Sequence, residues 1–239
     1  MSSINTRKSD IVWNYIGTIV SMASGFVLLP LLMHFLSSSE LGLWYVYVAL
    51  SNFAMLFEFG FNPTFARNIV YVISGAQHLS IEGCDIKSVQ EGIDWHLLNT
   101  VIKASKVIYA ILAVVVLALL STIGSLYISF VASGMGSFDI WVSWGLFCAS
   151  VFLNLYFLWS ITVLRGYGDI AGENKAVVIG RAAQLSVSAI LLLLGYGLVG
   201  AAIGYLANAI LLRLSAVVML RKHKEIEKGR HSDTMPVEA

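Results

Sequence analysis

Charged residues are scarce in this chain. Only 12% of its 239 residues are charged, with 15 Lys and Arg against 14 Asp and Glu, whereas soluble domains carry about 25%. Apolar residues make up 58% of the chain, and so few charged side chains cannot cover the surface of a water-soluble protein of this size. The composition therefore excludes a soluble enzyme and a disordered chain, and it predicts an integral membrane protein.

Cysteines and grouped metal ligands are also lacking. The two cysteines, Cys84 and Cys148, lie in a polar segment and in an apolar run, so they indicate neither a disulfide framework nor a metal centre. The histidines share no metal-ligand spacing, and the sequence has no phosphate-binding loop and no nucleophile paired with a base. A net charge of +1 offers no basic field for nucleic acid. We therefore expect no catalysis, no metal, no cofactor and no nucleic-acid partner.

Long apolar runs are what the sequence does contain. A bilayer core about 30 Å thick needs about 20 helical residues. The charge-free run from Ala182 to Leu212 fits either one over-long helix or two helices that meet at residues 195–200. With two helices there, the predicted membrane spans cover residues 11–36, 41–62, 107–132, 140–164, 176–195 and 199–220.

The positions of Lys and Arg decide between these two interpretations, because positive residues concentrate on the cytoplasmic side of a membrane. With six spans, the N-terminus, the second and fourth loops and the tail share one side, and with the adjoining helix ends they hold all 15 Lys and Arg residues. The loops on the opposite side, around 37–40, 133–139 and 195–198, hold none. This pattern predicts an all-α membrane protein with six transmembrane helices and both termini in the cytoplasm.

The predicted organisation also includes a cytoplasmic tail and a short helix before the third span. Residues 1–220 form a transmembrane lobe, and residues 221–239 form a basic cytoplasmic tail. Before the third span, residues 94–106 have the spacing of a short amphipathic helix with Asp94 as its N-cap. This helix is either an interfacial connector or an element that gates a cytoplasmic entrance.

Charged groups in or near the spans are the first candidate functional residues, since an ionisable group in a membrane is costly and usually faces a cavity. Glu58 near the end of the second span could bind a coupling cation or proton, or it could pair with Arg67. Arg67, Arg181 and Arg213 lie in or near cytoplasmic helix ends. Together they could hold a phosphate, or each could snorkel to lipid phosphates and set the topology.

Asparagines within the spans are the neutral candidates. Asn14, Asn52, Asn154 and Asn208 could line a polar cavity, or they could form hydrogen bonds between helices. Small residues spaced four apart, such as Gly200 and Gly204, predict close packing between helices.

The first third of the chain resembles a known family. It has a basic N-terminus, a helix that ends in LLPLL at 28–32, the turn LSSSELG at 36–42, and the motif FEFGFNP at 57–63. This order is similar to the first two helices of bacterial polysaccharide-biosynthesis flippases, the O-antigen-type translocases of the multidrug/oligosaccharidyl-lipid/polysaccharide exporter superfamily. The RGYGD loop at 165–169 also resembles the family.

The resemblance implies a function. Family members move oligosaccharides linked to undecaprenyl diphosphate from the cytoplasmic to the periplasmic leaflet of the bacterial inner membrane, by alternating access of two six-helix lobes around a polar, often cationic cavity. It also implies a coupling role for Glu58, which matches an acidic position of the family. Related lipid II flippases carry arginines in their first helix, and the span at 11–36 has none, so that site does not transfer.

Length is the main departure from the family, whose members usually have twelve or more helices. The chain therefore resembles one N-terminal lobe, to be completed by a second lobe or by a second copy. A multidrug-type antiporter lobe is an alternative within transport. A third alternative is a membrane scaffold that does not transport and that binds a polysaccharide polymerase or glycosyltransferases.

Overall fold

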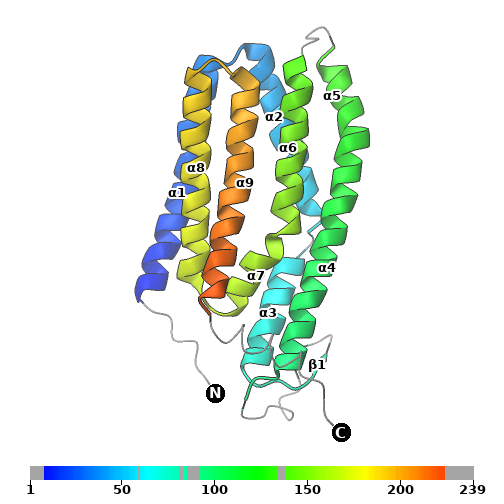
Figure 1. The fold of residues 1–239 in the computed structure, drawn as a ribbon, viewed down its shortest axis with the longest axis vertical. Helices are drawn as coiled ribbons and strands as arrows, with labels where there is room; N and C mark the ends of the chain where they lie inside the picture. The colour runs from blue at the N-terminus through cyan, green and yellow to red at the C-terminus, as the bar shows by residue number, and fades with distance from the viewer. Residues whose placement is uncertain (1–7, 59, 81–82, 85–91, 134–137, 224–239) are drawn as a thin grey trace.

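The fold is a bundle of long helices. The computed structural model describes residues 8–58, 60–80, 83–84, 92–133 and 138–223, and these are almost entirely helical (Figure 1). Five helical stretches are long and apolar enough to cross a membrane, or six if one bent helix pair counts as a span. The expected all-α membrane protein is therefore confirmed.

A tight turn joins the first two helices, α1 (Lys8–Phe35) and α2 (Ser38–Leu56). The Ser37 side chain accepts a hydrogen bond from the Glu40 backbone N–H at 3.3 Å, and the Glu40 carboxylate accepts one from the Ser37 backbone N–H at 2.9 Å. This reciprocal pair is a capping box, which satisfies two N–H groups at the start of a helix. It explains why the SSSE segment reverses the chain within a few residues.

The second predicted span, 41–62, differs from the structure. Helix α2 ends at Leu56, and a separate helix, α3 (Phe61–Ile73), begins after Gly60, whose φ is 81°. The two helices meet at 44°. A left-handed backbone favours glycine, so the glycine of the FEFG motif lies at a break rather than at the end of a straight span.

The third predicted span is part of a longer helix. Two antiparallel strands of two residues each, β1 (Leu79–Ser80) and β2 (Gly83–Cys84), come first. Helix α4 then runs over Trp95–Leu119. It continues through a π-helical turn, η2 (Leu120–Gly124), into α5 (Ser125–Val131). The Asp94 side chain accepts a hydrogen bond from the Leu97 N–H at 2.9 Å. The predicted N-cap and its helix are confirmed.

The last four helices form the other half of the bundle. Helix α6 (Phe138–Tyr156) is followed after one residue by α7 (Leu158–Gly166). Helices α8 (Ile170–Leu193) and α9 (Gly197–Arg221) are joined by a turn with positive φ at Gly195 and Gly197. The apolar run over 182–212 is thus two helices, as the distribution of Lys and Arg predicts.

Small residues bring α8 and α9 close together. A Cβ on Gly204 would collide with the Ser188 side chain, and one on Gly180 would lie 2.7 Å from Leu212 Cβ. Helix α1 packs on the other side of α8, and α6 packs on α9 with α4 beyond it (Figure 1). The expected close packing at Gly204 is confirmed, and it makes α8 and α9 the centre of the bundle.

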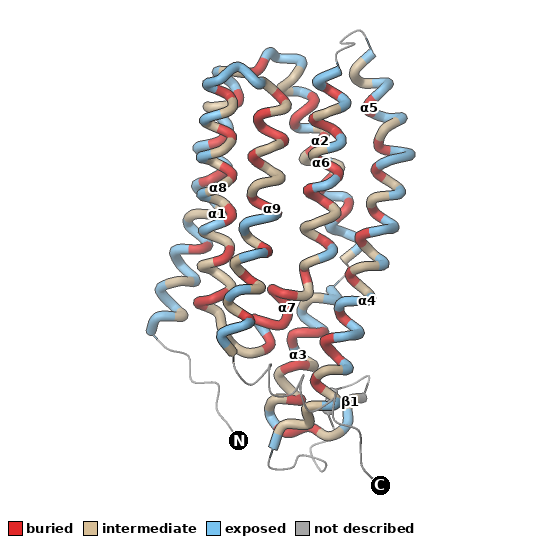
Figure 2. The backbone as a smooth tube through the Cα atoms, in the orientation of Figure 1, coloured by how far each residue is buried: buried red, intermediate tan, exposed pale blue. Residues whose placement is uncertain are grey.

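Burial follows the membrane interpretation. Buried and exposed positions alternate along the helices (Figure 2). Large apolar side chains such as Phe26, Phe130 and Phe138 are exposed. An exterior of apolar side chains, on a chain with few charged residues, is expected for a protein surrounded by lipid hydrocarbon rather than by water. The start of α1 and the end of α9 lie at the same end of the bundle (Figure 1).

Candidate functional site

Arg213 lies inside the bundle. Its side chain on α9 is only 8% exposed, and its Nη2 donates a hydrogen bond to Asn154 Oδ1 on α6 at 3.3 Å. The Nε and Nη1 atoms are buried and have no hydrogen-bond partner among the described residues. Among those residues, Arg213 also forms no ion pair with a carboxylate. A guanidinium with one neutral partner is therefore enclosed by membrane-spanning helices.

Such an arrangement is costly. Transfer of a charge out of water is unfavourable by several kcal/mol unless a partner of opposite charge compensates for it, and an arginine at the centre of a membrane helix costs about 2.5–3.5 kcal/mol on insertion scales. An ionisable group retained in such a place therefore usually has a function. The two unpartnered N–H groups of Arg213 are donors that suit an anion.

Arg181 belongs to a second polar cluster, between α8 and α9. Its Nη1 donates a hydrogen bond to Gln184 Oε1 at 3.1 Å, and Asn208 Nδ2 donates to the same oxygen at 3.1 Å. Gln184 and Asn208 are 4% and 7% exposed, whereas Arg181 is half-buried. Gln184 thus orients the guanidinium of Arg181. Gln184 is not among the residues predicted from the sequence, although a glutamine one turn after an arginine in an apolar helix was a usable signal.

Glu58 belongs to a third polar cluster, at the break between α2 and α3. Its carboxylate accepts a hydrogen bond from the Asn62 backbone N–H at 2.7 Å. The Asn62 side-chain oxygen accepts one from Thr162 Oγ1 on α7 at 3.0 Å, and that hydroxyl lies 3.4 Å from Tyr109 Oη on α4. The described residues show no ion pair between Glu58 and Arg67. The carboxylate caps the backbone of Asn62, and the Asn62 side chain begins a series of hydrogen-bonded side chains that runs from α3 through α7 to α4.

The other candidates point out of the bundle. Asn14 on α1, Asn52 on α2 and Arg67 on α3 are all exposed, so they line no cavity within the lobe. The three predicted arginines do not converge, because Arg67 is on the surface while Arg181 and Arg213 belong to separate hydrogen-bonded clusters. Among the hydrogen bonds of the described residues, the one between Arg213 and Asn154 is the only one that joins two of the predicted site residues directly.

Ion pairs tie α7, α8 and the end of α9 together. Arg165 Nε donates to Glu173 Oε2 at 3.2 Å, and His223 Nε2 lies 2.9 Å from Asp169 Oδ2. The hydrogen bond from His223 holds the pKa of the Asp169 carboxyl below its ordinary value, and burial opposes this shift. Asp169 also caps α8 by accepting from the Gly172 N–H at 2.8 Å.

No group of three His, Cys, Asp or Glu side chains that could hold a metal ion occurs among the described residues. Cys84 lies in the β2 strand, and Cys148 is a buried free thiol on α6. The arrangement of polar groups is suited to binding an anion and to linking helices.

The bundle and its buried polar clusters define a multi-pass α-helical membrane protein. Comparisons of the chain with protein-family models, with curated proteins and with solved structures give no match. The likeness to polysaccharide flippases therefore depends on the sequence motifs at 28–32, 36–42, 57–63 and 165–169.

Proposed function

We propose that the chain is one lobe of a transporter that moves an oligosaccharide linked to undecaprenyl diphosphate from the cytoplasmic to the periplasmic leaflet of the bacterial inner membrane. The observation that carries this proposal is the enclosed Arg213, whose Nε and Nη1 have no partner among the described residues. A guanidinium binds phosphate oxygens through its N–H donors more strongly than it binds neutral acceptors. A diphosphate would supply the charge that Arg213 lacks.

The distribution of Lys and Arg supports an orientation with both termini in the cytoplasm. In that orientation Arg213, eight residues before the end of α9 at Arg221, lies about 12 Å inside the cytoplasmic end of the helix. Arg181 on the neighbouring helix lies on the cytoplasmic half of α8. Two cations at similar depth suit a diphosphate that enters from the cytoplasm.

The exposed polar side chains support an assembly of two lobes. Asn14 and Asn52 lie on membrane-spanning helices and yet face outward, where contact with lipid leaves an amide without hydrogen bonds. A second six-helix lobe, or a second copy of this chain, would cover them and enclose a polar path. In this arrangement Glu58, held at the α2–α3 break, binds the coupling ion.

A membrane scaffold of a polysaccharide-synthesis complex is the second candidate, because the same exposed amides also suit a polymerase or a glycosyltransferase as the partner. A multidrug-type antiporter lobe has less support, since Glu58 is the one acidic residue within the predicted spans. The two leading candidates differ in one measurable property, which is binding of the lipid-linked substrate.

The test is binding of a fluorescent undecaprenyl-diphosphate oligosaccharide to the full chain in detergent, with Arg213→Gln and Arg181→Gln as variants. Arg221→Gln is the matched control, because Arg221 is an exposed cation on the same helix as Arg213. We expect at least tenfold weaker binding by each of the first two variants and unchanged binding by the control. Inorganic pyrophosphate should compete with the labelled lipid.

Two results would contradict the proposal. Equal binding by all three variants would remove both arginines from the site. Absence of binding by the parent chain, together with co-purification of a polymerase or glycosyltransferase, would favour the scaffold. For the coupling role, full transport by Glu58→Gln in proteoliposomes that contain the complete transporter would reject Glu58 as the coupling residue.

A further inference from the structure

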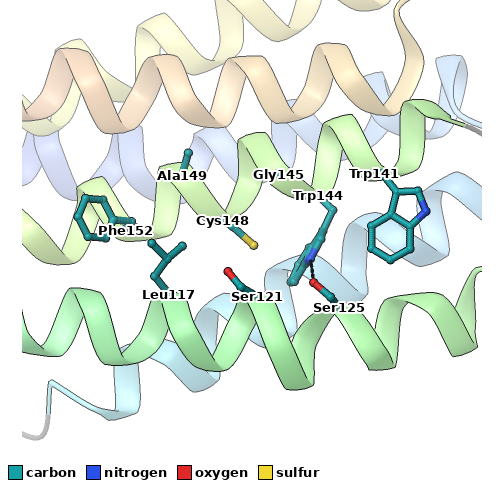
Figure 3. A pocket seen from close by; sticks show the side chains of 9 residues that line it. All are labelled: Leu117, Ser121, Ser125, Trp141, Trp144, Gly145, Cys148, Ala149 and Phe152. Carbon is teal, nitrogen blue, oxygen red and sulfur yellow. Dashed lines mark hydrogen bonds between the residues drawn. The ribbon is translucent and has the colours of Figure 1, made fainter.

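A groove runs along the outside of the bundle between α4–η2 and α6 (Figure 3). Its volume is about 460 Å³. Side chains from both helices point into the space between them, with Leu117 and Ser121 on one wall and Cys148 and Phe152 on the other (Figure 3). None of its nine lining residues belongs to the hydrogen-bonded clusters around Arg181, Arg213 and Glu58, and its lining is mostly apolar.

The π-helical turn η2 shapes one wall of the groove. A π turn contains an additional residue, and such bulges in α-helices occur frequently at functional sites. Gly124 of this turn packs under the ring of Trp144, where a Cβ would lie 2.9 Å from Cζ2. The Trp144 Nε1–H also donates a hydrogen bond to Ser125 Oγ at 2.9 Å (Figure 3). These contacts hold α6 against η2 and the start of α5 at the height of Trp144.

Next to Trp144 along α6, the groove contains unoccupied space at Gly145. A Cβ on Gly145 would meet no atom within 4 Å, although Gly145 lines the groove in the middle of α6. Ser121 is exposed in the groove. Small residues on the two facing walls therefore leave open space in the groove at this level.

The length of the groove matches one leaflet. From Trp141 to Phe152 it follows 12 residues of α6, and the 11 steps between them rise about 16 Å at about 1.5 Å each. Half of a hydrocarbon core about 30 Å thick is about 15 Å. Trp141 is 48% exposed and lies in the first turn of α6, where an indole suits the boundary between headgroups and chains. The groove thus extends from a membrane surface toward the midplane.

The surroundings of the groove are also apolar. Exposed side chains beside it on α4, η2 and α5 include Val114, Ile123 and Leu126, and these contact hydrocarbon in a membrane. Water is absent at this depth, so a groove open to the bilayer fills with lipid chains. A chain in contact with the lining side chains loses those contacts when it leaves the groove, and this distinguishes it from bulk lipid.

We propose that this groove binds one acyl chain of a phospholipid from the leaflet at the α5–α6 end of the bundle. The headgroup lies beside Trp141, and the chain runs past Gly145 and Cys148 to Phe152. This site is independent of the proposed transport function. The acyl chain lies between α4 and α6, beside the hydrogen bond between Trp144 and Ser125 that joins α6 to the start of α5.

The test uses the full chain in nanodiscs of phosphatidylethanolamine and phosphatidylglycerol, with a small fraction of phospholipid that carries a diazirine on one acyl chain. Irradiation and mass spectrometry locate the cross-links. We expect adducts to concentrate on residues 117–125 and 141–152. Gly145→Leu should lower them at least fivefold, because the new side chain enters the groove from a position where a Cβ meets no atom within 4 Å. Leucine also has a higher helix propensity than glycine, so the variant is expected to fold.

Gly25→Leu is the matched control. A Cβ on Gly25 would likewise meet no atom within 4 Å, but Gly25 lies on α1, far from the groove in the fold. Adducts at the groove should be unchanged in this variant. Ser121→Leu, which fills the groove from the facing wall, should reproduce the effect of Gly145→Leu.

Three results would overturn the proposal. Adducts spread evenly over the exposed apolar surface would show bulk lipid only. A groove signal that Gly145→Leu and Ser121→Leu leave unchanged would show that the chain lies elsewhere. Displacement of the phospholipid adducts by an equal amount of polyprenyl phosphate would assign the groove to a polyprenyl chain instead.

Discussion

Arg213 on α9 donates a hydrogen bond from Nη2 to Asn154 Oδ1 on α6, with 3.3 Å between the two atoms. The amide is neutral, so this contact orients the guanidinium without compensating for its charge. An ion pair would have compensated for that charge, whereas the single amide contact leaves Nε and Nη1 without a partner among the described residues.

Replacement of Arg213 by methionine should stabilise the free protein. The change removes an uncompensated buried charge and keeps most of the side-chain volume, so we expect unfolding to become harder by about 1–4 kcal/mol. Thermal unfolding of the full chain in detergent measures this, and the variant should melt at a higher temperature. A lower melting temperature would mean that Arg213 has a structural partner.

Asn154→Leu should have the opposite effect. It removes the one hydrogen-bond acceptor of Arg213 among the described residues, and loss of a buried partner costs about 1–3 kcal/mol. In the double variant with Arg213→Met this cost should disappear, because no cation remains to be satisfied. A double-mutant cycle of melting temperatures tests this coupling, and strictly additive effects would contradict it.

Gln184→Leu should loosen the contact between α8 and α9. Gln184 Oε1 accepts hydrogen bonds from both Arg181 and Asn208, and its loss leaves two donors without an acceptor. We expect a loss of about 1–2 kcal/mol, since hydrogen bonds between membrane helices average about 0.6 kcal/mol each and unpaired donors add to the cost. Ser186→Leu, at an exposed position on the same helix, is the control and should change stability little.

The exposed amides give a test of the assembly. Asn14→Leu and Asn52→Leu should leave the stability of the isolated chain unchanged within about 0.5 kcal/mol, because both side chains are on the surface. If a second lobe or a second copy covers them, the variants should weaken that association, which single-molecule counting in lipid vesicles can measure. Unchanged association in both variants would place the partner on another face.

Part of this fold could be predicted from the sequence because it depends on local signals. The turn at Gly195 and Gly197 follows from glycine and from the placement of Lys and Arg, and the start of α4 follows from the capping preference of Asp94. The break after α2 could not be predicted in this way, since FEFG fits the end of a straight span equally well. The backbone at Gly60 shows a left-handed turn there instead.

The site was harder to predict because hydropathy gives the depth of a residue but not the direction of its side chain. Asn14, Asn52 and Asn154 have similar apolar surroundings in the sequence. In the fold, Asn154 contacts Arg213, whereas the other two are exposed. The partners of Arg181 and Arg213 come from contacts between helices, which hydropathy and residue spacing do not reveal.

The pair formed by Asp169 and His223 should make the end of the bundle at which α8 begins and α9 ends sensitive to acid. The pKa of Asp169 lies below its ordinary value of 3.8 because His223 donates a hydrogen bond to the carboxylate. A lowered pKa in the folded state stabilises the fold above the ordinary value, and this contribution is lost as the pH falls through the folded pKa. Stability should therefore decrease as the pH falls below about 4.

Asp169→Asn separates this charge effect from helix capping. Asparagine caps a helix about as well as aspartate, so the start of α8 at Ile170 should persist while the charged pair with His223 is lost. Hydrogen exchange of the first turn of α8, measured on the full chain between neutral and acidic pH and expressed as protection relative to the intrinsic exchange rate at each pH, should show protection that falls with acid in the parent and a slightly lower, pH-independent protection in the variant. Equal acid sensitivity in both chains would assign the opening to another carboxylate, such as Glu173 in its pair with Arg165.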